Sequence, residues 1–166
     1  MTRMWRVLVA ALVALALIAV GCGSDDSTDT TDAEAAAHTE AAQLTEDWYA
    51  ANSAYKNNEP DAVPVSAYYV PDGYHLYNDK TIDNDALAHH FAGSPGIDNV
   101  WVEGKEPAPT AAEPPCDYTL VGEMQNTIGG SVVATGELTF CVVTTDEGLR
   151  LHHTAWGISD LRAVDG

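Results

Sequence analysis

The first apolar segment of the chain is an unbroken run over residues 7–20, preceded by Arg3 and Arg6 and followed by Gly21 and Cys22. This run is shorter than the roughly 20 residues that a membrane-spanning helix needs. A basic start, a short apolar run and small residues before a cleavage point are typical of a secretory signal peptide. An uncleaved transmembrane helix and a signal peptide cut without lipidation are the two other interpretations that the pattern permits.

Helical periodicity follows further along the chain. Apolar residues recur every three or four positions over residues 38–57, which predicts an amphipathic helix. We expect a second, short helix over residues 60–69 and a third over residues 84–92, which Asp83 can cap. Residues 70–73, with the sequence VPDG, predict a turn between the second helix and the first strand.

The remaining apolar segments alternate as strands do. Strands are expected over residues 74–78, 80–82, 100–103, 118–125, 132–145 and 149–158. The proline-rich residues 107–115 form an exposed loop, because proline cannot donate to a sheet ladder. Helices first and then a run of strands predict an α+β fold, with the helices on one face of a curved, mainly antiparallel sheet.

This order of elements, together with residues 67–74 (AYYVPDGY), resembles the cone-shaped NTF2-like fold. That superfamily includes SnoaL-like polyketide cyclases, ketosteroid isomerases and scytalone dehydratases. The resemblance covers residues 38–166 and implies three N-terminal helices packed on the sheet. The chain departs from the pattern at residues 83–87, where DNDAL stands in place of Gly-x-x-Ala/Glu-Ile.

The residues around Cys22 resemble a bacterial lipobox, with Ala19 in place of the usual leucine. The resemblance implies that the thiol is acylated and becomes the mature N-terminus. We therefore expect a lipoprotein signal peptide over residues 1–21, a flexible acidic tether over 22–37 and the folded domain over 38–166. The protein is expected at the cell membrane, lipid-anchored on the extracytoplasmic face.

The chain is strongly acidic. It has 25 acidic and seven basic residues, and removal of residues 1–21 would leave five basic residues and a net charge of −20. Such a surface repels nucleic acid and anionic headgroups, which need clustered lysine and arginine. The expected partners are the membrane, through the lipid on Cys22, and a small apolar ligand or an envelope protein.

Strand alternation predicts which side chains line a pocket inside the cone. The expected pocket-lining residues are Tyr118, Met124, Leu138, Phe140, Leu151 and His153. The opposite face carries apolar residues through which a homodimer could form: Val121, Val133, Val143 and Trp156.

Two functions are compatible with this face. The first is binding of a small apolar ligand or an envelope partner without chemistry, because the expected face is aromatic and aliphatic with few polar groups. The second is an isomerase, dehydratase or cyclase that uses His153 as acid/base and a tyrosine to polarise a carbonyl. The candidate tyrosines are Tyr68, Tyr69, Tyr74 and Tyr77. Non-catalytic binding is the favoured interpretation, and no cofactor is expected.

Two pairs of adjacent histidines, at 89–90 and 152–153, do not predict a metal site. Neighbours on a helix point about 100° apart and neighbours on a strand point to opposite faces, so each pair supplies at most one ligand to a shared site. No metal ligand is therefore expected.

Cys116 and Cys141 form an even pair in an oxidising compartment, which predicts a disulfide. Simple alternation, however, places them on opposite faces of the sheet. A bulge at Gly122 or Gly136 would bring them together, and so would a strand that starts late after Pro114 and Pro115. All three remain open at this point.

The lipid anchor can be tested directly. We expect the mature protein from the native host to carry the mass of a diacylglyceryl group on Cys22, and Cys22→Ala to lose it. Intact-protein mass spectrometry of membrane extracts measures this. An unmodified mature N-terminus in the wild-type protein would contradict the lipoprotein prediction.

Overall fold

The structure is a computed structural model that describes residues 28–57, 59, 61–92 and 96–161. The predicted signal peptide and Cys22 lie outside these residues. The described chain combines helices with one mixed sheet, as the α+β prediction requires. In this part of the chain, no helix is both long enough and apolar enough to cross a membrane.

The described residues form two α-helices, not the three expected, and only one of them is N-terminal. These are α1 (Thr28–Lys56) and α2 (Asn84–Ala92), and the second expected helix is a single 3₁₀ turn at Val65–Tyr68. Pro64 precedes this turn in an extended conformation, and Tyr69 after it is extended again. A proline has no N–H to donate and its ring crowds the preceding turn, so a longer helix cannot continue through it.

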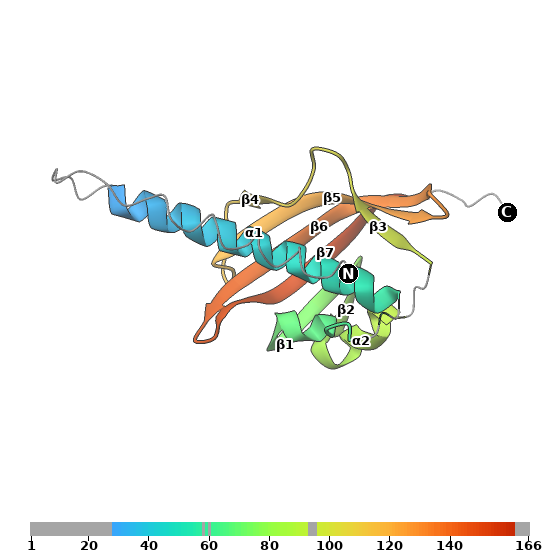
Figure 1. Cartoon of the computed structure of the whole chain (residues 1–166), viewed down its shortest axis with the longest axis horizontal. Coiled ribbons are helices and arrows are strands. Elements are labelled where there is room, and N and C mark those ends of the chain that lie inside the picture. Colours follow the sequence, from blue (N-terminus) through green and yellow to red (C-terminus); the bar gives the residue numbers. More distant parts are fainter. Residues whose placement is uncertain (1–27, 58, 60, 93–95, 162–166) are drawn as a thin grey trace, which may run out of the picture.

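The long helix α1 starts ten residues before the expected boundary at His38. Residues 28–37, which we assigned to the flexible tether, are therefore helical. The run Glu34-Ala35-Ala36-Ala37 explains the extension, since alanine and glutamate are strong helix formers. The first turns of α1 extend beyond the sheet, whereas its second half crosses the sheet face (Figure 1).

Seven strands among the described residues form one sheet in the order β2-β1-β7-β6-β5-β3, with β4 paired to β5. The pairing of β1 with β7 is parallel and the other pairings are antiparallel. The strands are β1 (Tyr69–Tyr77), β2 (Lys80–Asp83), β3 (Asp98–Trp101), β4 (Ala108–Thr110), β5 (Tyr118–Ile128), β6 (Ser131–Thr145) and β7 (Gly148–Leu161).

Two loop predictions need correction. The turn expected at residues 70–73 lies inside β1, where the register with β7 shifts between Tyr69 and Tyr74. The proline-rich loop contributes the short strand β4. It contains Pro109 at the edge of the sheet, which is where a strand tolerates proline.

A bulge in β7 changes which of its side chains face the core. Val142 pairs with Leu151 and Cys141 pairs with His153, so His152 is an extra residue on β7 without its own partner on β6. An extra residue reverses the alternation of the side chains that follow it. Thr154 and Trp156 consequently face the core and are buried, whereas His153 was expected there and Trp156 on the outside.

The core lies between α1, α2 and the covered face of the sheet (Figure 1). Trp48 of α1 forms its centre, packing edge-to-face on Phe91 of α2 and Phe140 of β6, with ring centroids 5.7 and 5.3 Å apart. Such aromatic pairs stabilise a core beyond the area they bury.

Cys116 and Cys141 form a disulfide, with their Cα atoms 5.2 Å apart. Cys116 lies before β5, which begins only at Tyr118. The strand alternation therefore does not constrain Cys116, and the loop brings its sulfur to the outer face that carries Cys141. Of the three explanations considered, the late strand start is the one observed.

The sheet also contains a backbone contact that can be tested by mutation. Gly136 of β6 is buried, and a Cβ atom there would collide with the carbonyl oxygen of Gly157 on β7. At Gly157 a Cβ atom would meet nothing within 4 Å. We expect Gly136→Ala to lower the free energy of unfolding by about 2 kcal/mol, in the range of overpacking. Gly157→Ala, the matched control, should leave it unchanged or raise it by about 0.5 kcal/mol. Urea unfolding of both variants checks this, and equal stability would contradict the close approach.

Candidate functional site

A cavity of about 350 Å³ lies between the helices and the covered face of the sheet. Its walls come from α1, α2, the segment before β3, and strands β1, β3, β5, β6 and β7. The lining residues are Trp48, Asn52, Lys56, His75, Tyr77, His90, Phe91, Ile97, Asn99, Met124, Asn126, Leu138 and Trp156.

The contribution of α1 follows from its periodicity. Trp48, Asn52 and Lys56 are spaced four residues apart and therefore lie on one face of the helix. Trp48 and Asn52 are each 1% exposed. The same face thus changes from an aromatic ring to an amide and then to an ammonium group toward the C-terminal end of the helix.

Lys56 is held at this end of the cavity by β3. Its Nζ donates to Oδ1 of Asn99 at 3.1 Å, and the hydroxyl of Tyr49 donates to the backbone oxygen of Asn99. Partial burial lowers the pKa of Lys56 to about 8, although the nearby charge of Asp98 acts in the opposite direction. The ammonium form still predominates at neutral pH.

His75 is buried at the end of a hydrogen-bonded chain. Its Nδ1 lies 2.7 Å from Oγ1 of Thr154, which lies 2.6 Å from the hydroxyl of Tyr69. If Tyr69 donates to Thr154 and Thr154 donates to Nδ1, every hydrogen in the chain has an acceptor, and the ring proton is then on Nε2. This arrangement leaves an Nε2–H donor on a ring that lines the cavity.

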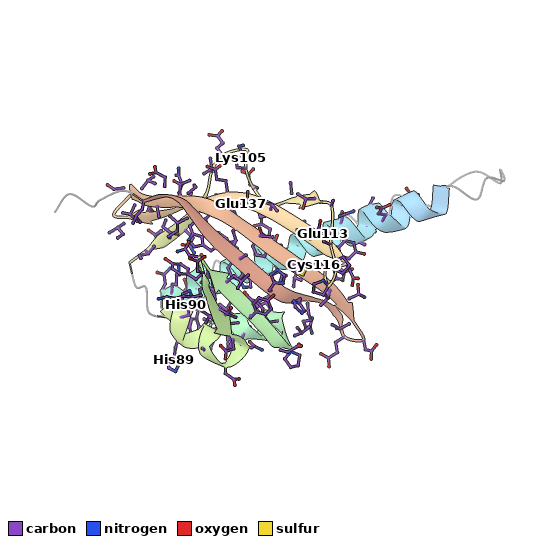
Figure 2. All side chains as sticks on the ribbon, turned by 180° about the vertical axis from the view of Figure 1, so that it is seen from behind. His89, His90, Lys105, Glu113, Cys116 and Glu137 are labelled. Carbon is purple, nitrogen blue, oxygen red and sulfur yellow. A yellow bond between two sulfur atoms is a disulfide. The ribbon has the colours of Figure 1, made fainter. Side chains whose placement is uncertain are left out.

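Burial is the main cause that lowers the pKa of His75 to about 3, and the neighbouring His90 adds to it. The two rings are 5.4 Å apart. Burial also lowers the pKa of His90, with a further contribution from Lys56. His90 and the exposed His89 are neighbours on α2 (Figure 2), but of the two only His90 lines the cavity. Both cavity histidines are therefore neutral at pH 7.

The polar atoms of the cavity wall that are buried without a hydrogen-bond partner include Asn52 Oδ1, Asn126 Oδ1 and Trp156 Nε1. Leaving a buried polar group unpaired costs about 1–3 kcal/mol. Groups of this kind in a cavity indicate a place for polar atoms of a ligand or for water.

The six residues predicted to line the pocket divide into three groups: two line the cavity, three lie in or against the core around it, and His153 faces away from it. Met124 and Leu138 line the cavity. Tyr118, Phe140 and Leu151 belong to the surrounding core but not to the lining.

His153 faces the other side of the sheet, because of the bulge. Its ring stacks on Tyr74 with centroids 5.0 Å apart, and its Nδ1 is 3.1 Å from Nδ1 of His152. The sulfurs of Cys116 and Cys141 and one nitrogen of His153 lie within 4.8 Å of one another. Both sulfurs belong to the disulfide, which leaves His153 as the one nitrogen ligand of this group.

Tyr77 was among the candidate tyrosines and lines the cavity, but the other polar residues of the cavity were not predicted from the sequence. Alternation along residues 74–77 places His75 and Tyr77 on one face and Leu76 on the other, and this pattern alone does not show which face is covered. Asn52 and Lys56 could have been found from the sequence, because they follow Trp48 at intervals of four residues and so share its helix face. A lysine in the last turn of a helix is, however, usually explained by the helix dipole.

Buried His75 should make the protein less stable in acid. Its pKa is lower in the folded chain than the unfolded value of 6.5, so the folded state takes up its proton only near pH 3. The stability is fully present above pH 6.5 and is lost as the pH falls below that value. We expect His75 to account for about 2 kcal/mol of the loss between pH 7.5 and pH 5.

The variant His75→Gln should show a correspondingly smaller loss, and His89→Gln, at an exposed position of α2, should behave like the wild type. Urea unfolding at intervals between pH 5 and 7.5 measures the difference. An unchanged pH dependence in His75→Gln would show that this ring is not kept neutral by the fold.

No protein-family model and no curated protein matches the sequence. Solved structures do match. An NTF2-like protein with a cystatin-like fold from Novosphingobium aromaticivorans superimposes with a TM-score of 0.61 at 16% identity, covering 85% of this chain and 95% of its own. An NTF2-like protein of unknown function from Pseudomonas aeruginosa gives 0.57 at 16% identity, covering 71% and 97%. One from Pseudomonas putida gives 0.55 at 16% identity, covering 74% and 87%. The chain therefore has the NTF2-like, cystatin-like fold.

Proposed function

We propose that the protein is a membrane-anchored extracytoplasmic lipoprotein whose NTF2-like domain binds a small, mainly apolar ligand without chemical conversion. The observation that carries the binding function is the cavity beneath α1. Its volume of about 350 Å³ is in the range of small-molecule sites. The lining combines aromatic and aliphatic side chains with amide, histidine and lysine groups, and convergent polar groups on an otherwise apolar wall are typical of such sites.

The polar groups support binding better than catalysis. A general acid or base works best when its pKa is near the operating pH. The pKa of His75 is about 3, so its neutral ring is too weak a base for that task. The pKa of Lys56 is about 8, so this group is mainly a protonated donor at neutral pH, and it already donates to Asn99. The cavity lining contains no carboxylate, and His153, the base considered in the sequence analysis, faces away from it.

Two observations support the extracytoplasmic location. The residues around Cys22 resemble a lipobox, and the disulfide between Cys116 and Cys141 suits an oxidising compartment. The part of α1 that extends beyond the sheet lies between this anchor and the domain in the chain (Figure 1). An acidic surface leaves the lipid as the attachment to the membrane.

The apolar face considered for a homodimer is smaller than expected. Trp156 belongs to the cavity wall, and Val121, Val133 and Val143 remain half-buried. This favours the cavity over the sheet face as the functional surface.

Filling the cavity tests the binding function. Asn126 lines the cavity with an unpaired Oδ1, so Asn126→Phe removes an unsatisfied atom while it occupies space. We expect the wild type to bind the neutral fluorescent probe N-phenyl-1-naphthylamine and Asn126→Phe to bind it at least about tenfold more weakly.

Gln125→Phe is the matched control, because it places the same ring on the adjacent, outward position of β5. It should bind the probe as the wild type does. Fluorescence titration measures all three proteins, and circular dichroism verifies that they are folded. Equal binding by Asn126→Phe and the wild type would contradict the cavity as the binding site.

A further inference from the structure

We infer that the ligand is a small ring-bearing carboxylic acid whose carboxylate pairs with Lys56. This inference rests on the proposed function, since it assigns a chemical class to the ligand of the same cavity. Lys56 supplies the charge, and the walls on either side of it supply the shape.

Among the lining residues that the structure describes, Lys56 is the only one whose charged form predominates at neutral pH. The amides of Asn52, Asn99 and Asn126 can donate as well as accept, so they favour polar groups without selecting the sign of a charge. The two cavity histidines are neutral and accept or donate likewise. The charge of the ligand is therefore selected by Lys56.

Lys56 also retains the capacity to bind an anion. An ammonium group has three N–H donors, and one of them goes to Asn99 Oδ1 at 3.1 Å. Within the described residues, no carboxylate lies at salt-bridge distance from Nζ, although Asp98 on β3 is near enough to act on its charge. Desolvation without a full counter-charge is costly, and a bound carboxylate would offset that cost.

A second donor in the cavity wall lies within electrostatic reach of Lys56. His75 and His90 are close enough to Lys56 for its charge to act on both rings. With Thr154 donating to Nδ1 of His75, the Nε2–H of this ring would be that donor. A carboxylate has two oxygens, so it can accept from Lys56 and from this ring at the same time.

The opposite walls determine the rest of the molecule. Trp48 and Phe91 meet edge-to-face, and Met124 and Leu138 complete this apolar surface. A planar ring can pack against such aromatic side chains in the edge-to-face or offset-stacked arrangements that aromatic pairs prefer. The size of the ligand is limited too, because the volume of the cavity is about 350 Å³.

Three naphthalene derivatives of similar size test the inference: 2-naphthoate, 2-naphthalenemethanol and 2-naphthylmethylammonium. We expect the wild type at pH 7 to bind 2-naphthoate at least about tenfold more tightly than the neutral and cationic compounds. Quenching of tryptophan fluorescence or calorimetry gives the three dissociation constants. Lys56→Met should lose the preference, whereas Lys56→Arg should keep it.

Lys105→Met removes an equal charge at an exposed position (Figure 2) and should leave the preference intact. Equal binding of the three compounds by the wild type would overturn the carboxylate inference while leaving the binding function in place. A preference that persists in folded Lys56→Met would overturn it as well. Absence of binding by all three compounds, together with N-phenyl-1-naphthylamine, would contradict both proposals.

Discussion

The extra residue His152 in β7 determines the composition of the cavity. After it, Thr154 and Trp156 face α1, and His153 faces outward toward Tyr74 and the disulfide. Oγ1 of Thr154 is the middle atom of the buried hydrogen-bonded series from Tyr69 to His75. Trp156 is part of the cavity wall. Without the bulge, His153 would face the core in place of Thr154. The hydroxyl that joins Tyr69 to His75 would then be missing. The hydrogen-bonded chain behind His75 and the place of Trp156 in the cavity wall depend on this single residue.

The second constraint is the attachment of β3 to α1 through Asn99. Its backbone oxygen accepts from Tyr49 and its side-chain oxygen accepts from Lys56, while the ring of Tyr49 packs on Trp101 with centroids 5.2 Å apart. The edge strand is thereby held beside the end of the helix, and the ammonium group is fixed at one end of the cavity. The contacts that stabilise this corner of the fold are also those that position the charge for a ligand.

Much of the fold was predictable because long strands and α2 have clear local patterns. The strands β5, β6 and β7 were expected within a few residues of their bounds, and α2 was expected over the residues it occupies. The orientation of residues after His152 was not predictable, since a bulge has no signature in the alternation and reverses it once present. The 3₁₀ turn at Val65–Tyr68 shows the other difficulty, because an apolar pattern does not reveal where a proline stops a helix.

The formal net charge of −18 raises the question of how an anion reaches Lys56. At physiological ionic strength the Debye length is about 8 Å, so charges spread over the acidic surface are largely screened from the site. A partly buried pair is screened much less, and the attraction at Lys56 therefore governs the affinity, while the surface acts mainly on the rate of approach. Asp98 is the acidic residue whose charge acts directly on Lys56. In the proposed binding function, its competition for the ammonium group would moderate the affinity for a carboxylate.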